Sequence, residues 1–133
     1  MHNVKIGTTR EIKLLVTEDV AIDFLGIGAR VLSTPNLIGK MERNSRDAVL
    51  PLLEDGYDTV GTKVSISHLA AASIGSVVTF TTEIIGVQDR RVEFRVSART
   101  EAEVIGEGTH ERTIINVARF AARQAAKTQV KSQ

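Results

Sequence analysis

The sequence predicts an α+β fold in which an antiparallel sheet of about five strands wraps around one long helix. Three observations lead to this fold class. One segment has a clear amphipathic helical pattern, four strand-like segments follow it, and one strand-like segment precedes it. Consecutive strands joined by short turns pair antiparallel, and such a sheet needs one face covered. The long helix is the natural cover.

The strand before the helix is expected in residues 9–17, where polar and apolar residues alternate imperfectly. Residues 18–33 contain two glycines and are predicted to form a loop or a short helix. Thr34 is predicted to cap the long helix, with Pro35 at its first position. Pro51 predicts a kink or an early end. The residues expected on the buried stripe are Leu37, Ile38, Met41, Ala48, Val49, Leu52 and Leu53.

The segments after the helix alternate as strands do. They cover residues 59–68, 76–87, 90–100 and 103–117, and a second helical pattern follows over 118–127. A strand, a helix, four strands and a terminal helix describe the hot-dog architecture. Folds of this kind and size usually pair their sheets across a dimer, so a homodimer or a higher homo-oligomer is expected.

Composition limits the possible functions. The 133 residues are enough for one domain, 1–133, whose tail at about 128–133 is expected to fray. A net charge of +1 and only 4% aromatic residues argue against a nucleic-acid partner. The lack of cysteine excludes disulfides and a cysteine nucleophile. No apolar run is long enough to span a bilayer and no signal peptide is visible, so no membrane partner and a cytoplasmic location are expected.

Three side chains are candidates for chemistry: Thr34, Glu42 and His68. His68 is in register with the apolar face of its strand, whereas strict alternation places Gly61 on the opposite face. Glu42 lies at the edge of the buried helical stripe. Thr34 precedes it by eight residues, or about 12 Å along a helix axis, so the sheet must help to bring the groups together. Each residue also has a structural interpretation: a helix cap for Thr34, a pair with Arg46 for Glu42 and a satisfied core histidine for His68.

The segment "GEGTHERTIINV" contains His110, Glu111 and Arg112, which alternate between the faces of a strand, so the three cannot enter one pocket. Either they are polar residues near a sheet edge, or Arg112 reaches an anionic or carbonyl group of a ligand. The chain's three histidines have no metal-ligand spacing, so no metal is expected.

Four motifs, "TPNLIGKME", "GTKVSISH", "RRVEFRVSA" and "GTHERTII", occur with the order and spacing of one family. From about residue 10 to residue 125 the chain resembles the fluoroacetyl-CoA thioesterases, a family of single hot-dog proteins. The resemblance implies hydrolysis of a small or medium acyl-CoA to a carboxylic acid and CoA. It implies a catalytic set of Thr34, Glu42 and His68, with Gly61 and Arg112 contacting the substrate. No cofactor is expected, and coenzyme A enters only as part of the substrate.

The resemblance also implies a hydrophobic lid before the helix, formed by phenylalanines in the fluoroacetyl-specific members. In this chain Phe24 is the only aromatic residue of that segment, and Leu25 and Gly28 occupy the lid positions. A broader or different acyl preference is therefore predicted. Two alternatives remain: a non-catalytic protein that binds acyl-CoA or another small ligand, and a hot-dog hydratase or dehydratase. The sequence lacks the Asp-x-Asn-Pro-x-His motif of hydratases, which counts against the second alternative.

Overall fold

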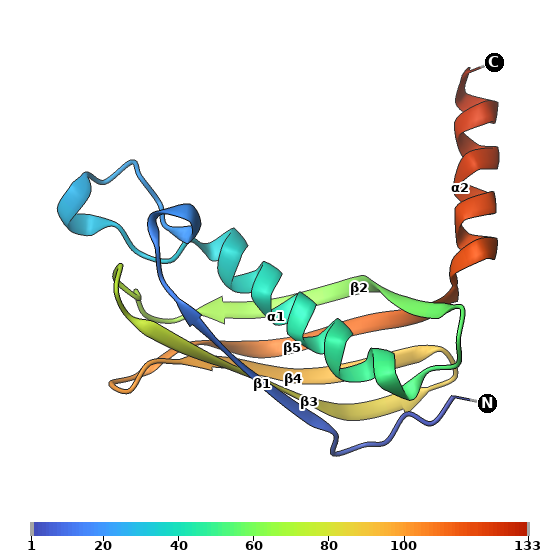
Figure 1. The fold of residues 1–133 in the computed structure, drawn as a ribbon, viewed down its shortest axis with the longest axis horizontal. Coiled ribbons are helices and arrows are strands. Elements are labelled where there is room, and N and C mark those ends of the chain that lie inside the picture. Colours follow the sequence, from blue (N-terminus) through green and yellow to red (C-terminus); the bar gives the residue numbers. More distant parts are fainter. Residues whose placement is uncertain (1, 133) are drawn as a thin grey trace.

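The computed structural model describes residues 2–132, and it folds them into one antiparallel five-stranded sheet crossed by a long helix (Figure 1). The order of strands across the sheet is β1-β3-β4-β5-β2. The strands are β1 (Thr9–Leu15), β2 (Tyr57–His68), β3 (Val77–Gln88), β4 (Arg91–Arg99) and β5 (Val104–Asn116), and the helices are α1 (Thr34–Val49) and α2 (Val117–Ser132). The predicted fold class and its five strands are confirmed.

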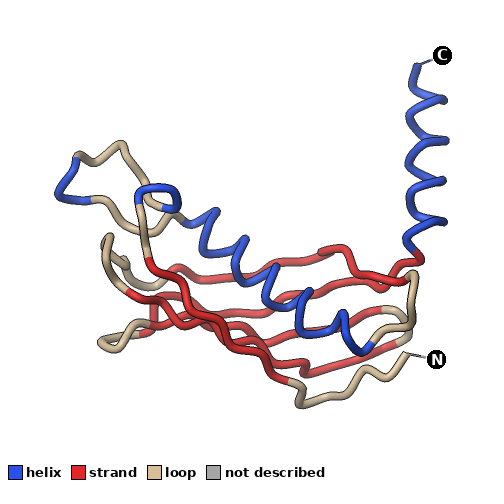
Figure 2. The backbone as a smooth tube through the Cα atoms, in the orientation of Figure 1, coloured by secondary structure: helices blue, strands red, loops and turns tan. Residues whose placement is uncertain are grey.

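Helix α1 begins differently from the prediction. Ser33, not Thr34, is the N-cap, and its hydroxyl accepts a hydrogen bond from the backbone N–H of Asn36 at 3.2 Å. Thr34 is the first helical residue, so its own hydroxyl is not used for capping. At the other end, α1 stops at Val49, and a 3₁₀ turn with Pro51 follows, which confirms the early end. The preceding loop holds two further 3₁₀ turns, Glu18–Val20 and Ile27–Ala29, and projects beyond the sheet (Figure 2).

The core lies between α1 and the inner face of the sheet. Alternate residues of β3 and β4 are fully buried there, including Phe80 and Phe94, against Leu37 of α1. The helix face is more polar than predicted, because Asn44 and Ser45 are also buried. The polar groups of these two side chains form hydrogen bonds with the sheet and with the helix itself. Their partners are Arg10 and the carbonyl of Phe80 for Asn44, and Thr82 and the carbonyl of Met41 for Ser45.

Helix α2 rises away from the sheet, and its main contact with the sheet is with β5, near its own start (Figure 1). It is longer than the predicted 118–127. The fraying predicted for 128–133 stays a prediction, and residue 133 lies outside the described residues. Within 2–132, no helix combines the length and apolar character needed to cross a membrane.

Candidate active site

A β-bulge determines which side chains of β2 share a face. Gly61 pairs with Arg112 of β5 and Lys63 pairs with Glu111, so Thr62 is an extra residue in the ladder. Past the bulge the alternation is shifted by one, and His68 lies on the same face as Gly61. The predicted opposite faces were wrong, because strict alternation does not hold across a bulge.

One end of this face holds Thr34 and His68. The Thr34 hydroxyl lies 2.7 Å from Nδ1 of His68, so the start of α1 fixes the orientation of the imidazole. The hydroxyl is available for this bond because Ser33 caps the helix. The other ring nitrogen of His68, Nε2, is buried and has no hydrogen-bond partner within the described part of the chain. Buried polar atoms are rarely unpaired, and they are found at sites where a ligand or a reacting group completes them.

The other part of the site is a corner built around Gly61. A Cβ atom on Gly61 would lie 3.1 Å from Oε2 of Glu42, 3.3 Å from Cε1 of His110 and 3.5 Å from Nη1 of Arg112. The three functional groups therefore approach one another across the backbone of a residue that has no side chain. Glycine is suited to this position because it lets other groups come close to its backbone.

Arg112 is held rigidly in this corner. Its guanidinium donates to the hydroxyl of Thr59 at 2.6 Å, to the carbonyl of Thr59 at 2.9 Å and to Nε2 of His110 at 3.1 Å. Since a guanidinium can only donate, Nε2 accepts, and the His110 proton is on Nδ1, which donates to the carbonyl of Lys63 at 2.9 Å. His110 is only 2% exposed and Arg112 only 8%.

The charges in this corner follow from burial. Burial lowers the pKa of His110, and the nearby positive charge of Arg112 lowers it further, although its bond to the Lys63 carbonyl opposes this. The imidazole therefore stays neutral. Burial also lowers the pKa of the Arg112 guanidinium, while the negative charge of Glu42 acts in the opposite direction. His110 was not among the predicted site residues. Its two-residue spacing from Arg112, which puts both side chains on one face of β5, is the sequence signal that could have identified it.

Within one chain, the predicted catalytic residues form two groups and not one. Thr34 contacts His68, whereas Glu42 lies with Gly61 and Arg112. Because Thr62 is an extra residue, Gly61 and His68 lie six ladder steps apart, or roughly 20 Å at 3.3 Å per step, and Glu42 forms no bond with His68 among the described residues. The expected acid–base pair over one helix face is not formed by a single chain.

Glu42 opens onto a shallow groove between α1 and β2 with a volume of about 480 Å³. The predicted alternative, a pair between Glu42 and Arg46, is not formed. Arg46 instead binds Asp58 at 2.7 Å and Asp47 at 3.1 Å, and its hydrogen bonds lower the pKa of Asp58. The Glu42 carboxylate is thus left facing the groove. No group of three or more metal-ligating side chains occurs in the part of the chain that the structure describes.

A sheet wrapped around one helix, with the Glu42 carboxylate on the groove between them and His68 farther along the same face, is the arrangement of a hot-dog protein. The family model for fluoroacetyl-CoA-specific thioesterases matches residues 16–118, and the chain belongs to this family. The fluoroacetyl-CoA thioesterase of Streptantibioticus cattleyicolor is 40% identical over 98 residues, which cover 74% of this chain and 70% of that protein.

Solved structures agree with this assignment. One of the fluoroacetyl-CoA thioesterase FlK matches with a TM-score of 0.85 and 31% identity, over 93% of this chain and 97% of that chain. A thioesterase superfamily member from Thermus thermophilus matches with a TM-score of 0.87 and 28% identity over 100% of both chains. The predicted hot-dog fold and family resemblance are confirmed.

Proposed function

We propose that this protein hydrolyses a small or medium acyl-CoA thioester to a carboxylic acid and CoA, at a site completed by two subunits. The family match and the 40% identity with a fluoroacetyl-CoA thioesterase support the reaction class. A point mutant of FlK has been solved with fluoroacetate and CoA, at 31% identity to this chain, which supports CoA as the carrier. The observation that carries the two-subunit site is the position of both groups of residues along β2.

β2 is an edge strand of 12 residues, and residues 61–65 in its centre are exposed. Such an edge presents unpaired N–H and C=O groups, which pair readily with another strand. If β2 pairs antiparallel with its copy about a two-fold axis, an axis between Val64 and Ser65 lies midway between Gly61 and His68. Glu42 and Gly61 of one subunit then face Thr34 and His68 of the partner subunit, and the dimer holds two identical composite sites.

The chemistry of the composite site follows from its groups. Glu42 acts as general base on a water molecule, or as the nucleophile itself, toward the thioester carbonyl. The backbone N–H of Gly61 and the guanidinium of Arg112 stabilise the negative charge that develops on the carbonyl oxygen. His68 of the partner subunit, oriented by its own Thr34, supplies a proton to the departing thiolate as the C–S bond breaks. When water is the nucleophile, the acid and CoA then leave; when Glu42 is the nucleophile, CoA leaves first, and water hydrolyses the acyl–Glu42 anhydride to release the acid and regenerate the carboxylate.

The projecting loop is proposed to shape the acyl pocket. Its apolar side chains Phe24, Leu25 and Ile27 are 76%, 61% and 84% exposed, so in one chain they cover nothing. Gly28 leaves room where a bulky lid residue would fill space, which favours an acyl group larger than fluoroacetyl.

A thiol-release assay with acetyl-, butyryl-, hexanoyl- and benzoyl-CoA tests the activity. Release from at least one substrate is expected, and Glu42→Ala or His68→Ala should each lower kcat by orders of magnitude while the dimer persists in sedimentation. CoA binding without release from any substrate would support the non-catalytic alternative. Enoyl-CoA hydration, followed by absorbance, tests the hydratase alternative.

Co-expression of the two inactive variants tests the composite site. In a mixed dimer one site carries both substitutions and the other carries neither. Because random pairing makes about half of the dimers mixed, about one quarter of the wild-type activity should return. If Glu42 and His68 of the same chain acted together, every site would stay defective and no activity would return.

A further inference from the structure

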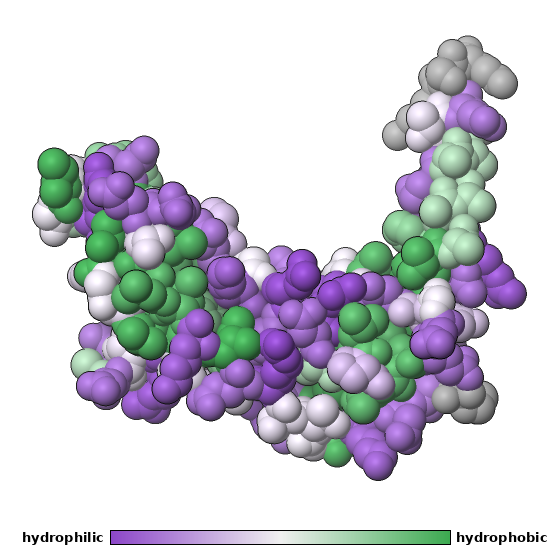
Figure 3. All heavy atoms as spheres, in the orientation of Figure 1, coloured by the Kyte–Doolittle hydropathy of each residue, from purple (hydrophilic) through white to green (hydrophobic). Residues whose placement is uncertain are grey.

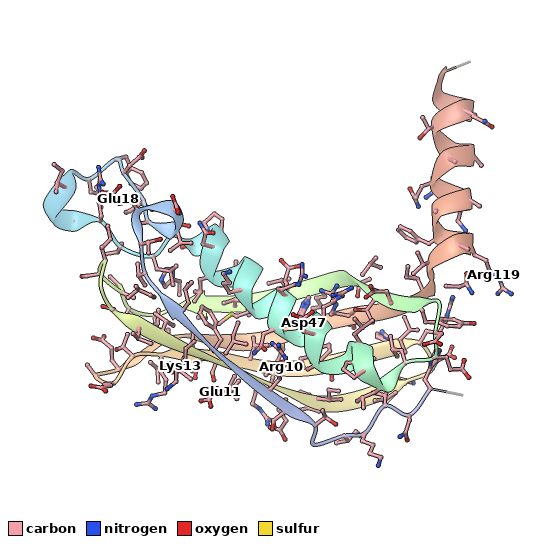
Figure 4. The ribbon with its side chains drawn as sticks, viewed as in Figure 1. Arg10, Glu11, Lys13, Glu18, Asp47 and Arg119 are labelled. Atoms are coloured by element: carbon pink, nitrogen blue, oxygen red, sulfur yellow. The ribbon has the colours of Figure 1, made fainter. Side chains whose placement is uncertain are left out.

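A second cavity lies at the base of α2, where the end of β5 and the start of β2 meet. It has a volume of about 180 Å³. The residues that line it include Tyr57, Asn116, Phe120 and three arginines, Arg90, Arg119 and Arg123. Figure 4 labels Arg119 at this position, beside the first turn of α2. Nothing in the thioesterase chemistry described above uses these residues.

The cavity is positively charged and uncompensated. Arg90, Arg119 and Arg123 take part in none of the ion pairs among the described residues, and no Asp or Glu lines the cavity. Other exposed arginines of the chain do pair with acids, for example Arg95 with Glu83. Three unpaired guanidinium groups around one hollow are suited to phosphate, which they bind through charge-assisted, bidentate hydrogen bonds.

The cavity lies on the same face as the candidate active site. Tyr57 precedes Gly61 by four residues and Asn116 follows Arg112 by four, and the two pairs are directly opposite each other in the β2–β5 ladder. The groove beside Glu42 extends toward this end of the sheet, since Asp58 and Thr59 line it. The surface between the projecting loop and α2 is hollowed and mainly hydrophilic (Figure 3).

The distance between the two sites matches the length of the pantetheine arm of CoA. Four residues of β2 span roughly 13 Å at 3.3 Å per residue. The pantetheine arm has about 13 bonds between its sulfur and the first phosphorus, and an extended chain covers roughly 3.6 Å per three bonds, which gives about 16 Å at full extension. A thioester carbonyl at Gly61 therefore places the phosphates of the nucleotide near the base of α2.

We propose that Arg90, Arg119 and Arg123 bind the phosphate groups at the nucleotide end of the acyl-CoA substrate. This inference rests on the proposed function, because it takes the thioester to lie at Gly61. The N-terminal end of α2, which is capped by Asn116, adds the positive end of a helix dipole to the same hollow. The arginines bind the substrate but do not touch the reacting bond, so they act on affinity and not on the chemical step.

The test compares two thioesters of the same acyl group, one carried by CoA and one by N-acetylcysteamine, which has no phosphates. In the double variant Arg119→Gln/Arg123→Gln, the KM for acyl-CoA should rise at least about tenfold with kcat nearly unchanged. The kcat/KM for the N-acetylcysteamine thioester should not change. The control is Arg95→Gln/Arg99→Gln, which removes the same charge from exposed positions of β4 and should leave both substrates unaffected.

Direct binding of adenosine 3′,5′-bisphosphate, measured by calorimetry, separates this inference from the proposed function. The wild type should bind this probe and the double variant should bind it at least about tenfold more weakly, even if no thioester is cleaved. Equal affinities for the probe, or an equal rise in KM for both thioesters, would overturn the role of the arginines while leaving hydrolysis intact.

Discussion

The geometry around Gly61 can be tested by adding a single methyl group. Gly61 is not among the residues with positive φ, so alanine can adopt its backbone conformation. The new Cβ would lie 3.1 Å from Oε2 of Glu42, whereas ordinary contacts begin at 3.4 Å. Relief of this contact therefore requires the carboxylate to move by about 0.3 to 0.5 Å, away from Gly61.

The effect on stability should be small, because Glu42 Oε2 is at the end of a flexible side chain and the fixed His110 ring, with Cε1 at 3.3 Å, has to yield by only about 0.1 Å. Alanine in a strand also gains about 0.5 to 1 kcal/mol over glycine, which offsets the contact. Activity should respond more strongly. A misplacement of 1 Å can lower a rate about 100-fold. If the effect scales with distance, a shift of 0.3 to 0.5 Å lowers kcat/KM by about 4- to 10-fold.

Gly86→Ala is a matched control. Gly86, like Gly61, lies next to a register shift, and a Cβ there would lie 3.4 Å from Oε2 of Glu93, a carboxylate far from the groove. Thiol-release kinetics and thermal unfolding of both variants give the comparison. Equal kcat/KM for the two variants, both folded, would refute the argument that Glu42 and Gly61 form one half of the active site.

Three further predictions concern the residues that support the site. Ser33→Ala should lower the free energy of unfolding by about 1 kcal/mol in urea titrations, since it removes the N-cap of α1. A larger decrease in this free energy for Thr34→Val would contradict the assignment of Ser33 as the cap. Asn44→Ala should lower the free energy of unfolding by about 2 kcal/mol, because the guanidinium and the backbone carbonyl of Arg10 both lose their hydrogen bonds to Asn44. An unchanged urea midpoint would contradict this prediction. The pKa of His110 is lowered in the folded state, so below about pH 6.5 the unfolded chain binds the extra proton and stability falls with falling pH, by at most about 1.4 kcal/mol per pH unit. His110→Gln should flatten this dependence between pH 7 and 5, and identical slopes would disprove it.

The fold could be predicted from the sequence because its signals are local. Alternation in residues 76–87 and 90–100 reflects strands with one face on the core, and the helical spacing after Pro35 reflects one buried stripe. The order of the elements then leaves few arrangements in which the sheet is covered. These patterns need no knowledge of side-chain partners, which is why all five strands and the long helix were found.

The polar details could not be predicted because they depend on partners distant in sequence. Asn44 looks like a solvent-facing residue until Arg10 and β3 are placed beside it. Either Ser33 or Thr34 could cap the helix by residue type, and only the bond from Thr34 to His68 shows why the cap moves one residue earlier. The choice of Ser33 leaves a hydroxyl free for the imidazole.

The bulge at Thr62 links the fold to the proposed mechanism. Gly61 and His68 are seven positions apart, an odd number, so a regular strand would place them on opposite faces. One extra residue puts both on the inner face, and on a strand whose outer edge is unpaired. Two half-sites on one face of an edge strand cannot meet within a chain, but they would meet in the proposed dimer, in which the strand pairs with its own copy. The same irregularity that misled the alternation pattern therefore makes a composite site in a dimer possible.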